Sequence, residues 1–122
     1  MKIVISSINN KYLETISLEN LDNLHETFKK LSSIQGPLKA KFFLINESIS
    51  SNQLSKFKNK FDKINNCSLS IYSNNRYTIL AGKSLKIDST LLKEKDLKNK
   101  LLLLDKEKKK DILHEGTVRS GD

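Results

Sequence analysis

The side chains that could carry covalent or acid–base chemistry are few and scattered. The chain of 122 residues contains one cysteine, Cys67, and two histidines, His25 and His114. A cysteine nucleophile needs a base within hydrogen-bond reach, and the spacing of these three residues does not indicate such a pair. A lone cysteine on an apolar face more often packs in a core, and a single cysteine also excludes an internal disulfide and suits a reducing cytoplasm. We therefore interpret Cys67 as structural.

Metal and phosphate chemistry also lack a sequence signal. Zinc sites need three or four Cys, His or carboxylate ligands at short spacing, and no such cluster occurs in the sequence. The four glycines are too dispersed to form a phosphate-binding loop. No catalytic residue, metal site or cofactor is predicted. We expect a binding module rather than an enzyme.

Positive charge is the strongest compositional signal. The formal net charge is +8, and residues 1–87 hold 13 basic and 6 acidic side chains. Such a surface attracts nucleic acid or an acidic protein. Only Arg76 and Arg119 are arginines, although arginine is favoured for bidentate contacts to phosphates and bases. We therefore favour an acidic protein partner over nucleic acid.

The element that should position everything else is the apolar run Phe42 to Ile45, within the segment 39–46. Four large apolar residues in a row leave neither face of a strand polar, so this strand must be covered on both faces. The segments before and after it place apolar residues on one face of a helix. These residues are Leu21, Leu24, Phe28 and Leu31 on one side, and Leu54, Phe57, Phe61 and Ile64 on the other.

Local signals define the ends of these two helices. Gly36-Pro37 ends the first helix, and Lys29 and Lys30 are expected in its last turn, where positive charge is favoured. Ser50 and Gln53 have the spacing of a capping box at the start of the second helix. Both helices are therefore predicted to be short and amphipathic.

The remaining folded segments are predicted to be strands. Residues 3–5 and 12–18 form an antiparallel hairpin around Asn9-Asn10-Lys11, because asparagine tolerates the backbone of a tight turn. Residues 67–72 alternate in polarity as a half-buried strand does, and Tyr77 to Leu80 form a further short strand. The order ββαβαβ predicts an α/β fold, an α+β sandwich in which a small mixed sheet packs against two amphipathic helices.

The composition changes at Asp88. Residues 88–111 are dense in Lys, Glu, Asp and Leu, and they are predicted to be a charged linker. The linker is partly helical, because Ser89 or Thr90 could cap a helix that carries Leu97, Leu101 and Leu104. Residues 112–122 are no longer helical in pattern. We therefore predict a domain over 1–87, a linker over 88–111 and the start of a truncated β domain at 112–122.

Two features, in this order, resemble the bacterial septum-site-determining protein family MinC. The hairpin, the helix with Lys30-Leu31, the apolar strand 42–46 and the following helix and strand are similar in layout to the N-terminal MinC domain. Thr117 to Gly121 resembles the opening of the C-terminal β-helical domain, where an Arg-Ser-Gly-Gln motif occurs, although Asp122 stands in place of the glutamine.

The resemblance implies a function and its partners. The N-terminal MinC domain opposes assembly of FtsZ, the tubulin-like division polymer, and Lys30, with its neighbour Lys29, matches a lysine linked to that inhibition. The C-terminal domain dimerises and binds the membrane-associated ATPase MinD, a role that would fall to Arg119, Ser120 and Gly121. The resemblance also implies a cytoplasmic cell-division protein that reaches the membrane only through MinD. Whether this chain itself forms a homodimer stays open.

Two alternatives stay open at this point. An RNA-binding or ribosome-associated domain would present aromatic residues on a sheet face, for which Tyr72 and Tyr77 are the candidates. A regulatory module resembling the anti-sigma-factor antagonists would carry a phosphorylatable serine at the start of a helix. Ser50 and Ser51 occupy such a place, although a helix cap explains Ser50 equally well.

Overall fold

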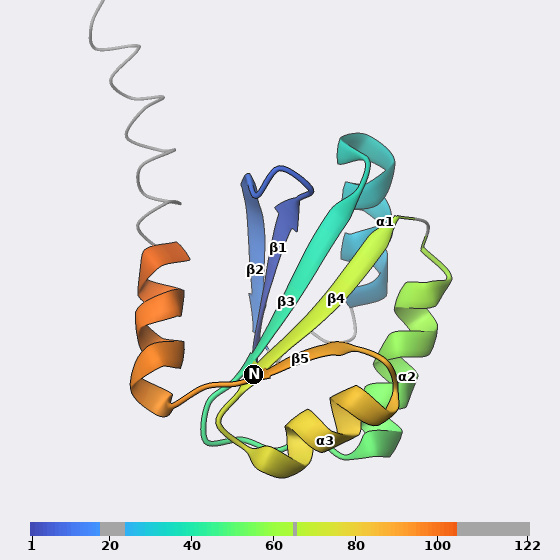
Figure 1. Cartoon of the computed structure of the whole chain (residues 1–122). Helices are drawn as coiled ribbons and strands as arrows, with labels where there is room; N and C mark the ends of the chain where they lie inside the picture. The colour runs from blue at the N-terminus through green and yellow to red at the C-terminus, as the bar shows by residue number, and fades with distance from the viewer. Residues whose placement is uncertain (18–23, 65, 105–122) are drawn as a thin grey trace, which may run out of the picture.

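The structure is a computed structural model that describes residues 1–17, 24–64 and 66–104. Five strands form one sheet in the order β2-β1-β3-β4-β5, and three labelled helices connect or cover them (Figure 1). A further helix begins at residue 94 and is described as far as residue 104; we name it the 94–104 helix. The labelled elements are β1 (Lys2–Ser7), β2 (Tyr12–Ser17), α1 (Leu24–Gln35), β3 (Leu38–Leu44), α2 (Ser51–Asp62), β4 (Cys67–Ser73), α3 (Arg76–Ser84) and β5 (Asp88–Leu91).

The sheet is mixed. β1 pairs antiparallel with both β2 and β3, whereas β3, β4 and β5 run parallel. Parallel neighbours need a crossover connection, and α2 and α3 supply the two crossovers. The predicted fold class is confirmed, as is the order ββαβαβ for the first six elements. The hairpin is also confirmed, with Asn10 in the left-handed conformation at φ +66°.

Strand β3 lies at the centre of the sheet, and its apolar run from Phe42 is buried on both faces, as predicted. Leu38, Ala40, Phe42 and Leu44 belong to the main core on the side of α1, α2 and α3. Phe43 points to the opposite side, where it packs with Val4 and Leu97. Figure 1 shows the 94–104 helix on that second side of the sheet. The molecule is therefore layered, with helices on both faces.

The main core is organised by phenylalanine rings from three elements. The rings of Phe28 in α1 and Phe61 in α2 meet edge to face with centroids 4.5 Å apart, and Phe42 of β3 lies 5.9 Å from Phe61. This confirms the predicted helix faces, except that Leu21 lies outside the described residues. The capping box is also confirmed: the Gln53 N–H donates to Ser50 Oγ at 3.2 Å, and the Gln53 side chain accepts from the Ser50 N–H.

The predicted strand from Tyr77 to Leu80 is wrong, because these residues belong to α3. Asn75 caps the helix by accepting the Thr78 N–H at 3.0 Å. Thr78 and Ile79 are buried while Tyr77 and Leu80 are exposed, which is the spacing of a helix rather than an alternating strand. A side chain at Gly82 would collide with Ser89 of β5, so this glycine lets the helix lie close to the sheet.

The folded unit continues past the predicted boundary at residue 87. Ser89 and Thr90 do not cap a helix but lie in β5, which pairs with β4. Leu97 of the 94–104 helix is 0% exposed and packs on Phe43. The linker prediction considered the leucines of residues 88–111 as part of an isolated helix. In the structure, Leu97, Leu101 and Leu104 pack on the second face of the sheet, beside Phe43. Residues 105–111 and 112–122 lie outside the described residues.

This packing makes a testable prediction about the 94–104 helix. Leu97→Ala should lower the free energy of unfolding by about 2–5 kcal/mol, because it removes a fully buried side chain and leaves a cavity. Lys95→Ala, at an exposed position of the same helix, should change it by less than about 0.5 kcal/mol. Urea unfolding followed by circular dichroism measures both. Equal tolerance of the two changes would show that the helix is not part of the folded unit.

Candidate functional site

Lys29 and Lys30 are both exposed on α1, as a contact surface requires. Their predicted position in the last turn is wrong, because α1 continues to Gln35 and has no basic residue in its last turn. The chain keeps helical geometry until Gly36, whose φ of +82° lies in the left-handed region. A role for Lys30 in complementing the helix dipole is therefore weakened, since that effect falls off within the last turn.

The surface next to Lys30 is apolar. Ile34 lies one turn further along α1 and is 63% exposed, which is unusual for a large aliphatic side chain. The turn between β1 and β2 reaches the same end of the molecule, since the Ile8 N–H donates to the Pro37 carbonyl at 3.2 Å (Figure 1). Ile8 is also largely exposed. We call Lys29, Lys30, Ile34 and Ile8 the α1 surface.

Lys29 also borders a polar hollow between α1 and the end of α2. The hollow has a volume of about 480 Å³, and Lys29, His25 and Lys63 are among its lining residues. The Nδ1 atom of His25 is buried and has no hydrogen-bond partner among the described residues. Two lysines at one hollow give this side of α1 a basic character suited to an acidic partner.

The second face of the sheet carries basic residues that sequence reasoning missed. The strand register places Lys2 beside Phe43, and Val4 beside Lys41, on this face. The signal was present in the sequence, because Lys39, Lys41 and Phe43 alternate along β3 with period two. The prediction for β3 rests on its apolar run alone, which does not assign a face to Lys39 and Lys41.

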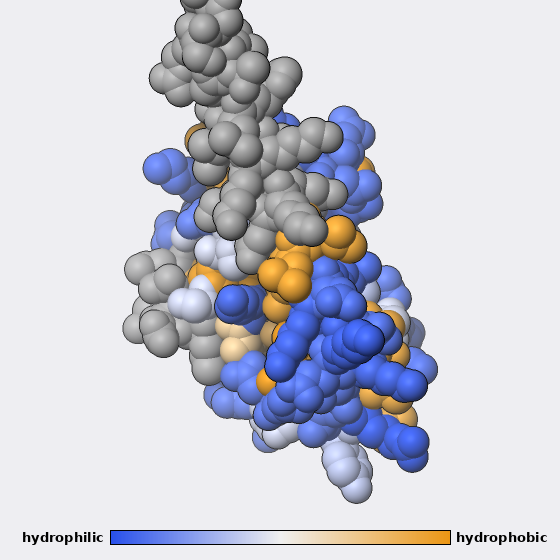
Figure 2. All heavy atoms as spheres, turned by 90° about the vertical axis from the view of Figure 1, so that its left-hand side faces the viewer, coloured by the Kyte–Doolittle hydropathy of each residue, from blue (hydrophilic) through white to orange (hydrophobic). Residues whose placement is uncertain are grey.

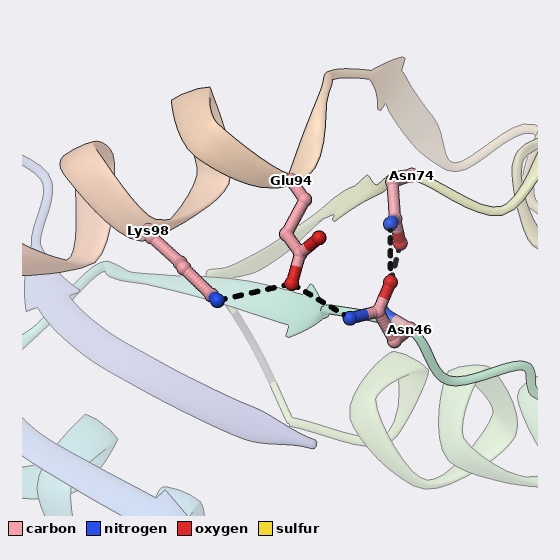
Figure 3. A network of polar contacts seen from close by, with 4 residues as sticks. All are labelled: Asn46, Asn74, Glu94 and Lys98. Atoms are coloured by element: carbon pink, nitrogen blue, oxygen red, sulfur yellow. Dashed lines mark hydrogen bonds and ion pairs between the residues drawn. The ribbon is translucent and has the colours of Figure 1, made fainter.

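A network of polar side chains holds the start of the 94–104 helix against the ends of β3 and β4 (Figure 3). Asn46 and Asn74 exchange hydrogen bonds: Asn74 Nδ2 donates to Asn46 Oδ1 and the Asn46 N–H donates to Asn74 Oδ1. Asn46 Nδ2 then donates to Glu94 Oε1 at 2.8 Å, and Lys98 Nζ lies 3.0 Å from the same oxygen. The hydrogen bond from Lys98 and then that from Asn46 lower the pKa of Glu94, so its carboxylate stays charged.

The two tyrosines considered for RNA binding do not form a stacking surface. Tyr77 is on the exposed side of α3 and not on the sheet. Tyr72 does lie on the sheet, but its ring is stacked on Phe43 at 5.2 Å between centroids, and Lys100 Nζ lies 4.9 Å from the Tyr72 centroid. The ring is therefore already stacked and in contact with a cation, which leaves little room for a base.

A relative of known family matches the whole chain. The chain is 46% identical, over 126 aligned positions, to the probable septum site-determining protein MinC of Prochlorococcus marinus subsp. pastoris. The match covers 100% of this chain and 56% of the relative. The resemblance to the MinC family is confirmed. No family model matches the chain, and no solved structure does.

The match agrees with the predicted layout of a MinC N-terminal domain, and the chain spans 56% of the length of the relative. Lys29 and Lys30 are positioned by α1 as described above. Arg119, Ser120 and Gly121, which the MinC resemblance links to MinD, lie outside the described residues. Within the described ranges, no helix is long and apolar enough to cross a membrane.

Cys67, which we interpreted as structural, has an environment that opposes its reactivity. It lies at the start of β4 and packs partly buried against the main core. Burial raises the pKa of its thiol from 9.0 to about 11. The thiolate is the reactive form, and desolvation disfavours it.

The raised pKa of the Cys67 thiol predicts slow alkylation of this residue. At pH 8, iodoacetamide should modify the native protein about 100-fold more slowly than the urea-unfolded protein, because two pKa units correspond to about 100-fold less thiolate. The native rate should keep rising until pH approaches 11, whereas the unfolded rate should level off near pH 9. Mass spectrometry of timed samples measures both profiles. Matching profiles would mean that the thiol is not desolvated.

Proposed function

We propose that this chain acts in septum placement as the FtsZ-inhibiting part of a MinC protein. The observation that carries the proposal is the 46% identity, over the whole chain, to a relative named as a septum site-determining protein. It acts by direct contact with the FtsZ polymer, without catalysis and without a cofactor. A basic domain of this size is suited to binding an acidic protein surface.

The α1 surface is the contact that we propose. Interfaces between proteins commonly have an apolar centre surrounded by a polar rim. Here Ile34 and Ile8 supply exposed apolar area, and Lys29 and Lys30 supply the charged rim. Lys30 adjoins Ile34 on the same side of α1, one turn away, so a single partner surface can meet both. The lysines would also speed the encounter, an effect that weakens as salt screens them.

The remaining partners follow from the same family relationship. We propose that Arg119, Ser120 and Gly121 belong to a MinD-binding segment whose completion requires the C-terminal domain, and that this domain dimerises. The protein would then be cytoplasmic and would reach the membrane only through MinD. These proposals concern a whole MinC protein. The matched relative is longer than this chain, which covers 56% of it.

Charge reversal at Lys30 tests the site. Lys30→Asp should reduce inhibition of FtsZ polymer sedimentation by about fivefold or more, because a charged group at a contact is replaced by a repelling one. Lys95→Asp makes the same change at an exposed position of the 94–104 helix and should leave inhibition unchanged. Equal losses with the two variants would point to diffuse charge instead of a site. No inhibition by the unmodified chain would overturn the function itself.

The apolar part of the surface is tested separately. Ile34→Ser should also weaken inhibition, while stability should change by less than about 0.5 kcal/mol because the side chain is largely exposed. Leu80→Ser on α3 is the matched control, since Leu80 is an equally large and exposed side chain away from α1. Sedimentation at low and high salt distinguishes the contributions: the Lys30 effect should shrink with salt, and the Ile34 effect should persist.

A further inference from the structure

The second face of the sheet is only partly covered by the 94–104 helix. Leu97 fills the space over Val4 and Phe43, but Leu102 and Leu103 of the same helix are 57% and 60% exposed. Figure 2, which views the molecule from this side, shows hydrophobic atoms at the surface among hydrophilic ones. Two hollows are formed where the helix and the sheet meet, with no lining residue in common.

The larger hollow is apolar with a basic border. Its volume is about 520 Å³, within the range of ligand-binding pockets. Its one carboxylate, Glu47, is neutralised by the amino terminus of Met1 at 2.6 Å. Lys98 is paired in the same way with Glu94, so the net contribution of the border is the one positive charge of Lys2. The full lining is Met1, Lys2, Phe43, Ile45, Glu47, Lys98, Leu101 and Leu102.

The smaller hollow, of about 280 Å³, is more polar and also contains two lysines, Lys41 and Lys100. It includes Ser6, which is 4% exposed and whose hydroxyl has no hydrogen-bond partner among the described residues. A buried hydroxyl without a partner costs free energy, which a ligand able to accept its proton would recover. An irregularity in the β1–β2 pairing between Ile5 and Ser6 sets this serine opposite Tyr12.

The chemistry of the two hollows selects one class of occupant. The larger hollow fits an apolar side chain, and the smaller one presents the Ser6 hydroxyl to a carboxylate, beside the positive charges of Lys41 and Lys100. We propose that the second face of the sheet, on the two sides of the 94–104 helix, is a docking surface for an acidic protein segment that also carries a large apolar side chain. This surface is distinct from the α1 surface and does not depend on the proposed function.

Two other occupants fit the surface less well. A second copy of the chain would bring the same face, with its lysines, against Lys2, Lys41 and Lys100, and like charges repel. Single-stranded RNA would need free aromatic faces, but Phe43 is buried, and the Tyr72 ring is stacked on Phe43 and contacted by Lys100. Charge complementarity and the apolar lining together therefore favour the acidic protein segment.

Synthetic probes test the proposal on the full chain. A short fluorescein-labelled peptide of glutamate and leucine should bind, as measured by fluorescence anisotropy. Peptides of equal length with serine in place of leucine, or lysine in place of glutamate, should bind at least about tenfold more weakly, which corresponds to about 1.4 kcal/mol. A single-stranded RNA of matched length should also bind more weakly.

Matched variants then locate the binding surface. Lys2→Glu, in β1, should weaken binding of the glutamate–leucine peptide about fivefold, as reversal of one border charge does. Lys95→Glu, on the helix but lining neither hollow, should have no effect. Ser6→Ala should weaken binding while leaving the melting temperature unchanged or higher, because it removes an unpartnered buried hydroxyl. A drop in melting temperature would instead assign the hydroxyl a purely structural role.

Three results would overturn the proposal. One is equal binding of the glutamate–leucine and glutamate–serine peptides, which would leave no role for the apolar hollow. Another is equal weakening by Lys2→Glu and Lys95→Glu, which would reduce the effect to overall charge. The third is tighter binding of RNA than of the peptide. Because none of these measurements uses FtsZ, they are independent of whether the chain inhibits its assembly.

Discussion

The arrangement of the whole molecule depends on two adjacent phenylalanines in β3 that point to opposite faces of the sheet. Phe42 enters the main core and Phe43 the second face, and both are about 1% exposed. Since successive side chains of a strand alternate, neither ring can be buried by a layer on one side alone. The helices α1 and α2 cover the first face, and the 94–104 helix covers the second. Each face then acquires its own border of lysines.

The sequence predicted those features whose signal is local. The hairpin around Asn10, the capping box of Ser50 and Gln53 and the helix faces around Phe28 and Phe61 are set by residues a few positions apart. The segment Tyr77 to Leu80 was mistaken for a strand because four residues do not separate a helix period from an apolar run. Two features make this segment a helix: Asn75 caps it, and the parallel strands β4 and β5 need a crossover between them. The second feature is a property of the sheet and is not visible in the local sequence.

The site residues divide in the same way. The sequence identified Lys29 and Lys30 through a family resemblance, and their exposure on α1 agrees with a contact role, although their place in the helix was wrong. It did not identify the apolar neighbours, because Ile8 and Ile34 are brought to one end of the molecule by the pairing of Ile8 with Pro37. The lysines of the second face were visible as an alternating pattern. Their importance depends on the 94–104 helix, which turns a flat face into two hollows.

The two basic surfaces should act independently of each other. Their lysines lie on opposite sides of the sheet, with Lys29 and Lys30 on α1 and Lys2, Lys41 and Lys100 on the second face. Salt screens exposed charges over about 8 Å at physiological ionic strength, so a lysine on one surface acts only weakly on a partner bound at the other. An anionic partner on α1 therefore leaves the attraction of the second face almost intact. A small domain with this charge is suited to contact two acidic surfaces at once, since the sheet both holds and separates its two sets of lysines.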